Sequence, residues 1–504
     1  MRQIGDSVVY LAGVQPHDGK RYKIQMMTSN GNSQGKAYIM GYFRSGPGQT
    51  HKVEQLHYAY SRDGRHWYEL NENKPVWAAT LGEGVLRDPF IGRGPDGRWR
   101  IVFTTRPRGP SIGYAVSDDL IHWTDERALP LMADIPNTVN CWAPEFSCDP
   151  ETEEFLVYWA SSTGTNLSNS KHYAARTKDW VTFSKTELFY DPGFQTIDAS
   201  LAEHDGKFYM AVKDEAHVYE PHQHPQPPMN YLAVADRLEG PYKTIPGVQT
   251  PDYTEGPEFL WIEAEQKWLL LYDYWAYGKF GVMESEDMIH WSRELDADQV
   301  RFPYRARHAT VFPVSGAELA RLLNRYALLA HYPTTTYAPV RVAAWEEGGF
   351  LHDAFGLRTV TMQVRANSRS GTQVLYDEGD ADNGLALRIR AGRLEAAVCS
   401  NGVRLVAAVD ANGFELSQWQ DVALTFDEGV LSLYANGALG AQEAASFVLV
   451  RSHDSAGGYG GRFGQDAFGD SAGCAAFDGA IRNVCVYSVP LRAEDITLAS
   501  RPFL

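Results

Sequence analysis

Five short motifs recur along the first 310 residues at an almost constant spacing, and this period constrains the fold more than any other feature of the chain. Each motif contains one residue that can exchange a proton: Asp88 in Arg-Asp-Pro, Glu145 in Trp-Ala-Pro-Glu, Asp198 in Ile-Asp-Ala-Ser, Glu255 in Glu-Gly-Pro and His308 in Arg-His-Ala-Thr. The successive separations are 57, 53, 57 and 53 residues. Such a period predicts one supersecondary unit that is used five times.

Most of the motifs are followed by an apolar run of the length of a strand, as at residues 98–104, 155–160, 207–212 and 267–272. This order places each motif on the first strand of its unit. If the units are arranged radially, their first strands meet around one axis. The three carboxylates at Asp88, Asp198 and Glu255 then face one pocket.

A second repeat, out of phase with the first, is a turn that carries an acid and ends in an aromatic residue. It occurs five times, at residues 61–67, 117–123, 177–183, 235–242 and 285–291. Turn-forming Asp and Gly between strand-like runs are typical of a hairpin at the outer edge of a blade.

Because the first turn precedes the first motif, the units are circularly offset. We therefore expect the strand at 308–314 to be completed by N-terminal strands near 37–43 and 55–60. The prediction is an all-β chain that begins with a five-bladed β-propeller. The alternative is a two-sheet β-sandwich in which the spacing is a coincidence.

At 504 residues the chain exceeds what one core normally supports, so at least two domains are expected. Ser315 and Glu318 have the spacing of a capping box ahead of an amphipathic run, which predicts one helix that seals the propeller. From about residue 357 the chain shows alternating strand patterns and no helical period. We predict a propeller over residues 1–350 and a jelly-roll β-sandwich over residues 351–504.

The five motifs, in this order, resemble glycoside hydrolase family 43, a family of five-bladed β-propellers. The resemblance covers roughly residues 30 to 330 and departs from the family pattern at Ala199, where Pro is frequent, and at Ala309, where Gly is usual. The C-terminal part looks like the laminin-G and concanavalin type of sandwich. It is either a carbohydrate-binding module or a stabilising domain with no site of its own, and the short, partly apolar connection favours the second.

The resemblance implies an inverting glycoside hydrolase. Such an enzyme uses one carboxylate to deprotonate water and one carboxylic acid to protonate the leaving oxygen, roughly 6.5–9.5 Å apart. It implies Asp88 as the general base and Glu255 as the general acid. Asp198 would orient Glu255 and raise its pKa, because a nearby like charge disfavours ionisation.

Other residues near the motifs are candidates for substrate binding. Trp142 can stack on a sugar or fill the channel between blades. Glu145 resembles no catalytic group of the family, so we expect a structural or hydroxyl-binding role. Arg87, Lys213 and Arg307 can donate hydrogen bonds to sugar hydroxyls or neutralise the acids.

No cofactor is expected to be required. His308 can lie near a calcium ion or a water molecule in the central channel, as in family relatives, so a structural calcium there is a further prediction. The five Cys residues cannot all pair, and none has zinc-ligand spacing, so free thiols are expected: Cys141, Cys148, Cys399, Cys474 and Cys485.

The net charge of −17 argues against a nucleic-acid partner, which requires a clustered basic surface. The first residues lack the apolar stretch of a signal peptide, and no later segment reaches ~18 apolar residues, so we expect no membrane partner and a cytoplasmic location. The expected partner is an oligosaccharide or the side chain of a polysaccharide. The oligomeric state stays open.

The predicted function is an exo-acting α-L-arabinofuranosidase, because long segments at 162–170 and 217–228 would narrow the pocket entrance. Galactofuranosides and xylosides are alternative substrates within the family. A β-fructofuranosidase of family 32 is a second alternative, but its Asn-Asp-Pro nucleophile motif has no counterpart in residues 1–60. The third is a sugar-binding protein without catalysis, against which the retention of all three acids argues.

Overall fold

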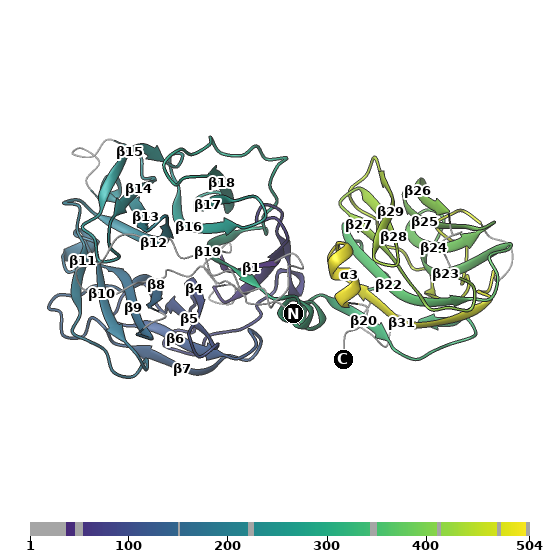
Figure 1. Ribbon diagram of the computed structural model, residues 1–504, viewed down its shortest axis with the longest axis horizontal. Coiled ribbons are helices and arrows are strands. Elements are labelled where there is room, and N and C mark those ends of the chain that lie inside the picture. The colour runs from purple at the N-terminus through teal and green to yellow at the C-terminus, as the bar shows by residue number, and fades with distance from the viewer. Residues whose placement is uncertain are drawn as a thin grey trace, which may run out of the picture.

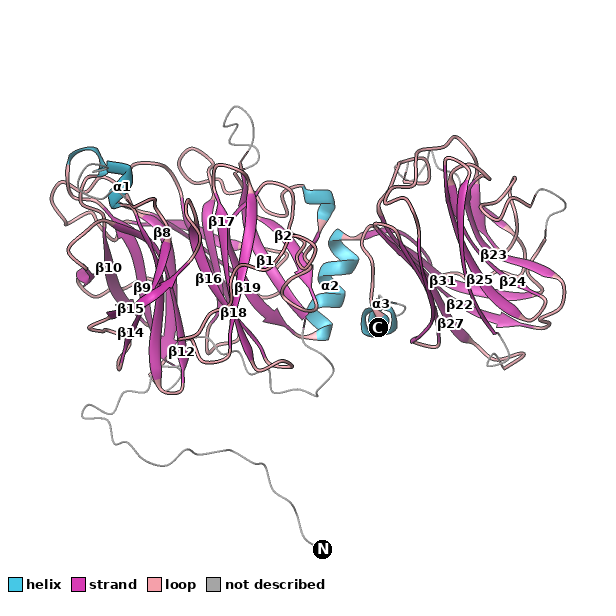
Figure 2. Cartoon of the chain, turned by 90° about the horizontal axis from the view of Figure 1, so that it is seen from above, coloured by secondary structure: helices cyan, strands magenta, loops and turns pink. Residues whose placement is uncertain are grey.

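The computed structural model describes residues 37–45, 54–149, 152–219, 226–342, 350–410, 415–470 and 475–499. Over these ranges the chain is nearly all β, and its strands form two bodies with helix α2 between them (Figures 1 and 2). The first body is a propeller and the second is a two-sheet sandwich. Both parts of the predicted fold class are confirmed.

Four antiparallel sheets follow one another along the chain and form four blades of the propeller. The first is β4 (Arg87–Arg93), β5 (Trp99–Thr104), β6 (Ile112–Ser117) and β7 (Thr124–Leu129). The second is β8 (Trp142–Asp149), β9 (Glu154–Ser161), β10 (Lys171–Thr177) and β11 (Glu187–Tyr190). The third is β12 (Thr196–His204), β13 (Lys207–Asp214), β14 (Asn230–Ala235) and β15 (Lys243–Gln249), and the fourth is β16 (Glu255–Ile262), β17 (Lys267–Tyr274) and β18 (Lys279–Ser285).

The fifth blade joins the two ends of the propeller. It consists of β19 (Ala306–Val314), β1 (Ala37–Arg44), β2 (His57–Ser61) and β3 (Tyr68–Glu69), in this order. Ala37 pairs with Val314, so an N-terminal strand completes the last blade as the offset repeat predicts. The innermost strands contact one another in a closed ring, β4 to β8, β12, β16, β19 and back to β4 (Figure 1). The five motifs therefore surround one axis.

Each innermost strand is interrupted by a β-bulge at its motif. At each bulge one residue has a positive φ, namely Asp88, Ala143, Asp198, Gly256 and His308. A bulge adds an unpaired residue and redirects the side chains next to it, and such features are common beside active sites. Four of these residues are not glycine, so the backbone is strained at one level around the axis.

The predicted outer turns share one hydrogen-bonding pattern in four blades. Each Asp accepts backbone N–H groups two and three residues further on, for example Asp119 from Ile121 at 2.9 Å and from His122 at 2.8 Å. The same pattern is present at Asp63, Asp179 and Asp287. These local bonds end the third strand and start the fourth, which explains why the turn recurs in the sequence.

Short helical segments lie outside the sheets: η1 (Asn71–Asn73), η2 (Thr165–Leu167) and α1 (Ala216–Tyr219). The longest helix is α2 (Gly316–Tyr326), and its N-terminus carries the predicted capping box between Ser315 and Glu318. Figure 2 shows α2 between the propeller and the sandwich, where it contacts α3 (Ala493–Ala499).

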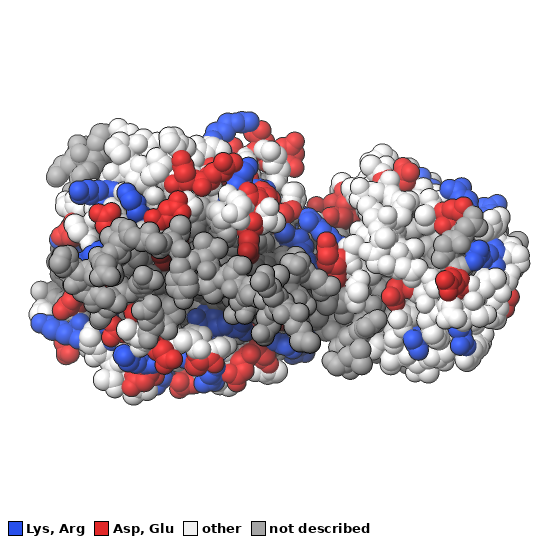
Figure 3. Space-filling view, viewed as in Figure 1, with Lys and Arg blue, Asp and Glu red and all other residues white. Residues whose placement is uncertain are grey.

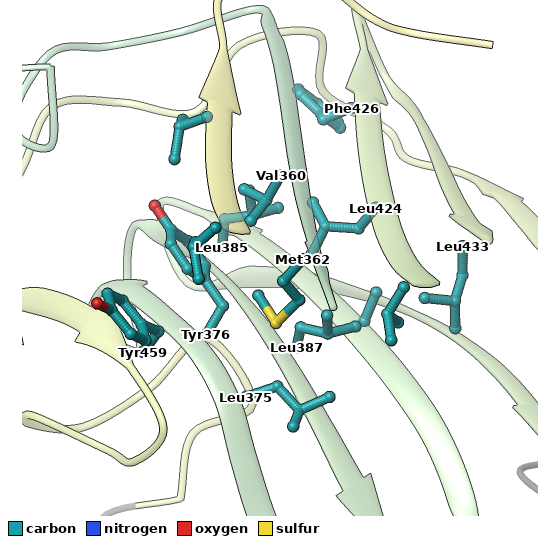
Figure 4. Packing of buried hydrophobic residues seen from close by; sticks show 14 of the residues in the cluster. Val360, Met362, Leu375, Tyr376, Leu385, Leu387, Leu424, Phe426, Leu433 and Tyr459 are labelled. Carbon is teal, nitrogen blue, oxygen red and sulfur yellow. The ribbon is translucent and has the colours of Figure 1, made fainter. Parts of the chain in front are cut away.

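The sandwich consists of two six-stranded sheets. One sheet contains β20 (Leu328–Tyr332), β31 (Gly479–Tyr487), β22 (Leu357–Ala366), β27 (Gln420–Asp427), β28 (Val430–Ala435) and β29 (Ala438–Ala444). The other contains β21 (Val340–Val342), β30 (Gly457–Tyr459), β23 (Thr372–Gly379), β24 (Gly384–Arg390), β25 (Arg393–Ser400) and β26 (Val403–Asp410). Side chains from the two inner faces interdigitate, as Figure 4 shows for Met362, Leu375, Leu387 and Leu424.

Two strands that precede residue 350 belong to the sandwich sheets. β20 pairs with β31, and β21 pairs with β30. The division of the chain at residue 350 stays a prediction, but this pairing means that the sandwich draws strands from residue 328 onward. The partners of these strands lie more than a hundred residues away, which is why the local pattern did not reveal the pairing.

The propeller and the sandwich share one apolar cluster. It contains Tyr60, Tyr68 and Leu70 of the propeller, Leu319, Leu322 and Leu323 of α2, and Ala423, Tyr434, Tyr487, Val489, Leu491 and Ile496 of the C-terminal part. Tyr68 also donates a hydrogen bond to Asp427 at 2.6 Å. The buried Arg62 and Asp495 form an ion pair across the same boundary. The sandwich is thus packed against the propeller rather than tethered to it.

Among the residues that the structure describes, no helix has the length and apolar character needed to cross a membrane. Four cysteines lie in the described ranges as free thiols, Cys141, Cys148, Cys399 and Cys485. Cys474 lies outside them.

Candidate active site

A pocket of about 270 Å³ opens at the end of the axis where the five bulges lie. The three acids expected to carry the chemistry, Asp88, Asp198 and Glu255, all line it. They come from β4, β12 and β16, so three blades contribute one carboxylate each. Its other lining residues are Phe43, Ser45, Glu54, Arg87, Thr104, Pro107, Trp142, Ile197, Glu215, Arg307 and His308.

His308 lies between two of the acids. Its Nδ1 is 3.4 Å from Oδ1 of Asp88 and 3.9 Å from Oδ2 of Asp198. Burial disfavours the charged imidazolium, but the surrounding carboxylates, with Asp88 and Asp198 foremost, outweigh it and raise the pKa of His308. Thr104 fixes Asp88 by donating a hydrogen bond from Oγ1 to Oδ2 at 2.7 Å. Asp88 is thus held by groups on two sides.

Glu255 is clamped between two cations. One carboxylate oxygen accepts a hydrogen bond from Nζ of Lys213 at 2.8 Å, and the other accepts one from Nη2 of Arg307. Each cation has a second acidic partner: Lys213 contacts Glu215 at 2.7 Å and Arg307 contacts Asp273 at 2.9 Å. Charges therefore alternate in sign along a buried row whose centre is Glu255.

This row reverses the protonation that we expected for Glu255. Burial alone would raise the pKa of Glu255, but the charges of Lys213 and Arg307 outweigh burial and lower it to about 2. Burial raises the pKa of Asp198 to about 7. The expectation that Asp198 keeps Glu255 protonated in the free protein is wrong, because the attraction of two cations exceeds the repulsion of one acid.

Three predicted binding residues, Arg87, Trp142 and Arg307, line the pocket. Arg87 donates a hydrogen bond to Glu54 at 2.5 Å, and its side chain stays partly exposed. Trp142 donates from Nε1 to the carbonyl oxygen of Pro107 at 3.0 Å, which fixes its ring at the pocket wall. Arg307 also lines the pocket, whereas Lys213 is buried behind Glu255 and touches it from the side.

Glu145 lies deeper in the channel than the other motif residues. In its strand the bulge falls at Ala143, two residues before Glu145, whereas in β4 it falls at Asp88 itself. Glu145 is therefore buried below the pocket, where it accepts a hydrogen bond from Tyr158 at 2.6 Å. Burial and the neighbouring Glu258 raise its pKa well above the usual range. Of the two roles that we expected for Glu145, this position fits the structural one.

The predicted calcium ion would lie beside His308. Calcium takes six to eight oxygen ligands, and the two carboxylates beside His308 offer at most four oxygen atoms. Within the described ranges, no three His, Cys, Asp or Glu side chains are placed to hold a metal. The predicted calcium stays a prediction, and no step of the chemistry below depends on it.

Sequence reasoning missed residues at the ends of the second strands. Thr104 ends β5 and Asp273 lies near the end of β17, each beside a bulge of the first strand. Asp273 also accepts a hydrogen bond from the backbone N–H of His308 at 2.7 Å. The sequence feature that could have identified Thr104 and Asp273 is a polar residue at the end of an otherwise apolar run. Glu54, from the segment before β2, gave no such signal.

Comparison with known families agrees with this architecture. Residues 34–320 match the model of a family described as "Probable glycosyl hydrolase domain", which is related to glycoside hydrolase family 43. The match covers more than half of the chain. The chain belongs to this family. Residues 336–497 match the concanavalin A-like lectin/glucanases superfamily.

Individual relatives of the chain are distant. An α-L-arabinofuranosidase of Bifidobacterium longum subsp. longum is 23% identical over 175 residues, which span 29% of this chain and 16% of the relative. Among solved structures, a thermostable family-43 glycoside hydrolase is 18% identical with a TM-score of 0.35, over 44% of this chain and 75% of the other. An α-L-arabinofuranosidase from Lactobacillus brevis is 15% identical with a TM-score of 0.35, over 46% and 90%.

Proposed function

We propose that the protein is an inverting, exo-acting glycoside hydrolase that removes terminal furanosyl units, with α-L-arabinofuranosides as the preferred substrates. The observation that carries the proposal is the meeting of Asp88, Asp198 and Glu255, from three different blades, in one small pocket. Two carboxyl groups on opposite sides of a glycosidic bond are what this hydrolysis requires.

In the proposed reaction, Asp88 removes a proton from the attacking water. Its carboxylate is held by Thr104 on one side and faces His308 on the other. Water attacks the anomeric carbon as the glycosidic bond breaks, so the configuration of that carbon is inverted. The positive charge that develops on the sugar is favoured by the acids around it.

Glu255 protonates the leaving oxygen in this proposal, and it must first gain a proton. Arg307 lines the pocket, so the hydroxyl groups of a bound sugar can accept its hydrogen bonds in place of Glu255. The loss of one cation would raise the pKa of Glu255 towards the working range of a general acid. Asp198, whose pKa burial raises to about 7, is a nearby group that is protonated for part of the neutral range.

The size of the pocket supports attack at the end of a chain. Its volume of about 270 Å³ lies below the range of roughly 300–1,000 Å³ typical of drug-sized ligands, which suits one sugar unit. Residues 220–225 of the segment that we expected to narrow the entrance lie outside the described residues.

The preference for arabinofuranosides is drawn from the comparison with known proteins. One curated relative is named an α-L-arabinofuranosidase, and the match spans a small part of it. Galactofuranosides and β-xylosides are the alternatives. A panel of nitrophenyl furanosides and pyranosides tests the choice, and the proposal fails if a pyranoside is cleaved fastest. Absence of cleavage across the panel would favour a non-catalytic sugar-binding protein.

We predict that hydrolysis inverts the anomeric carbon. Because Asp88 is proposed to activate water rather than to attack the sugar, no covalent intermediate forms. Proton NMR in the first minutes should show the inverted anomer before mutarotation mixes the two forms. Formation of the retained anomer first would require a nucleophile, and the family 32 alternative would then be favoured.

We predict that Lys213→Met shifts the pH dependence of kcat/KM. Lys213 is one of two cations that lower the pKa of Glu255, so its removal raises that pKa and keeps the acid protonated at higher pH. The alkaline limb of the profile should move up by about one pH unit or more. Lys243→Met, at an exposed lysine of β15, should leave the limb in place. An unmoved limb in Lys213→Met would contradict the coupling.

A further inference from the structure

The axial channel has a second pocket at the end opposite to the candidate active site. It has a volume of about 440 Å³ and is lined by the later parts of the same innermost strands. Along β8, for example, Trp142 lines the first pocket and Ser147 lines the second. Ser147 lies five strand residues beyond Trp142, which at about 3.3 Å per residue is a separation of roughly 16 Å. The proposed hydrolysis uses no residue of this second pocket.

The walls of the second pocket are mainly apolar and aromatic. They include Phe90, Phe146, Leu201, Phe259, Trp261 and Phe312. Pockets with such walls and a few polar groups are typical of small-molecule sites. The walls favour a flat, apolar ligand body over a sugar, because each sugar hydroxyl would need a hydrogen-bond partner that an apolar wall does not offer.

One polar group in this pocket lacks a partner. The Ser147 side chain is 2% exposed, and its Oγ makes no hydrogen bond with any residue that the structure describes. A buried hydroxyl without a partner is costly, and a ligand hydroxyl would satisfy it. Ser200 is already engaged, since it donates to Glu258 at 2.9 Å. Ser147 is therefore the buried polar group of the apolar walls that a ligand hydroxyl could satisfy.

The charged residues of the pocket disfavour anions. Glu203, Asp205 and Glu263 line it, and Asp205 is largely exposed. Glu258, also in the lining, is protonated for part of the neutral range, because burial raises its pKa to about 7. An anionic ligand would meet three carboxylates and no free lysine or arginine among the described lining residues.

We propose that this end of the channel is a second binding site, for a small uncharged aromatic alcohol. The aromatic body lies between the walls formed by Phe146 and Trp261, and the hydroxyl group bonds to Oγ of Ser147. The site is separate from the hydrolytic pocket, so it can exist whether or not the proposed hydrolysis is correct.

Isothermal titration calorimetry with 2-naphthol tests the proposal on the full-length protein. We expect one site with a Kd on the order of 0.1 mM, as the number of ligand atoms permits. 2-Naphthoate, which has the same rings and a negative charge, should bind at least ten times more weakly. The absence of binding by 2-naphthol, or equal binding of the two probes, would overturn the proposal.

Three variants locate the bound probe. Ser147→Ala should weaken 2-naphthol binding about 5-fold to 10-fold, because the hydroxyl contact is lost. Ser370→Ala, at an exposed serine of the sandwich, should leave the affinity unchanged. Trp142→Ala should also leave it unchanged, because Trp142 lines only the active-site pocket of the two. An unaffected Ser147→Ala variant, or lost binding in Trp142→Ala, would show that the probe binds elsewhere.

Discussion

Asp88→Asn and Glu255→Gln are each expected to lower kcat/KM for a nitrophenyl arabinofuranoside by about 100-fold to 10,000-fold. In Asp88→Asn the water loses its general base, while the amide oxygen can still accept the hydrogen bond from Thr104. In Glu255→Gln the leaving oxygen loses its proton donor. Steady-state kinetics measure both effects.

Folding controls show whether each variant keeps the native structure. Circular dichroism should show a native β signal for both. Glu255→Gln should also lower Tm, because Lys213 and Arg307 lose the carboxylate that they share in a buried place. Asp236→Asn and Glu286→Gln, at exposed positions, should retain wild-type turnover and Tm. Added azide should not rescue Asp88→Asn with a retained product. Wild-type-like turnover by Asp88→Asn or Glu255→Gln would contradict the assignment of that residue.

Removal of residues 357–504 is expected to cause aggregation of the propeller. The truncation would expose the propeller side of the shared apolar cluster, including Tyr60, Tyr68 and α2. It would also leave Arg62 without Asp495, although Arg62 is almost fully buried in the intact chain. A surface with the character of a domain core is unstable in water. Size-exclusion chromatography and light scattering of the truncated protein measure the outcome.

A point variant tests the same interface without deleting a domain. Asp495→Ala should destabilise the protein by about 3–5 kcal/mol, because the buried Arg62 loses the carboxylate with which it forms an ion pair. Asp118→Ala removes the partner of Arg98 at an exposed site and should cost less than about 1 kcal/mol. Thermal unfolding compares the two. A soluble, fully active truncation would show that the sandwich is a tethered module instead.

The surface offers little guidance to partners. On the part of the face in Figure 3 that is not drawn in grey, Lys and Arg are interspersed with Asp and Glu over the propeller, and no basic cluster gathers there. The proposed carbohydrate substrate rests instead on the glycosyl hydrolase family and on the pocket on the axis.

The repeat in the sequence was enough to predict the propeller, because the turns and strands of each blade are specified by residues that are close together in the sequence. The acid turn is specified within seven residues, as at Ser117 to Trp123, and each strand is specified by its own apolar run. The offset between the two repeats was enough to predict that β1 pairs with β19. The capping box at Ser315 was equally local, so the start of α2 was predictable.

The depth at which each motif side chain lies in the axial channel could not be predicted in the same way. Glu145 and Asp88 occupy similar places in their motifs, yet only Asp88 lines the pocket. The bulge falls at Asp88 in one strand and at Ala143 in the other. The place of a bulge depends on how the neighbouring strand pairs, and a shift of one position turns a side chain to another direction. A single motif does not contain this information.

The sequence by itself determined the number of blades, their closure, the helix after them and the acids that face the axis. Only the tertiary structure decided the charge on Glu255 and the attachment of the sandwich. Lys213 lies 42 residues before Glu255, and Arg307 lies 52 residues after it. Periodicity records which residues share a position in a blade. Electrostatic coupling instead depends on side chains that distant strands bring within hydrogen-bonding distance, where a few ångströms set the sign of a pKa shift.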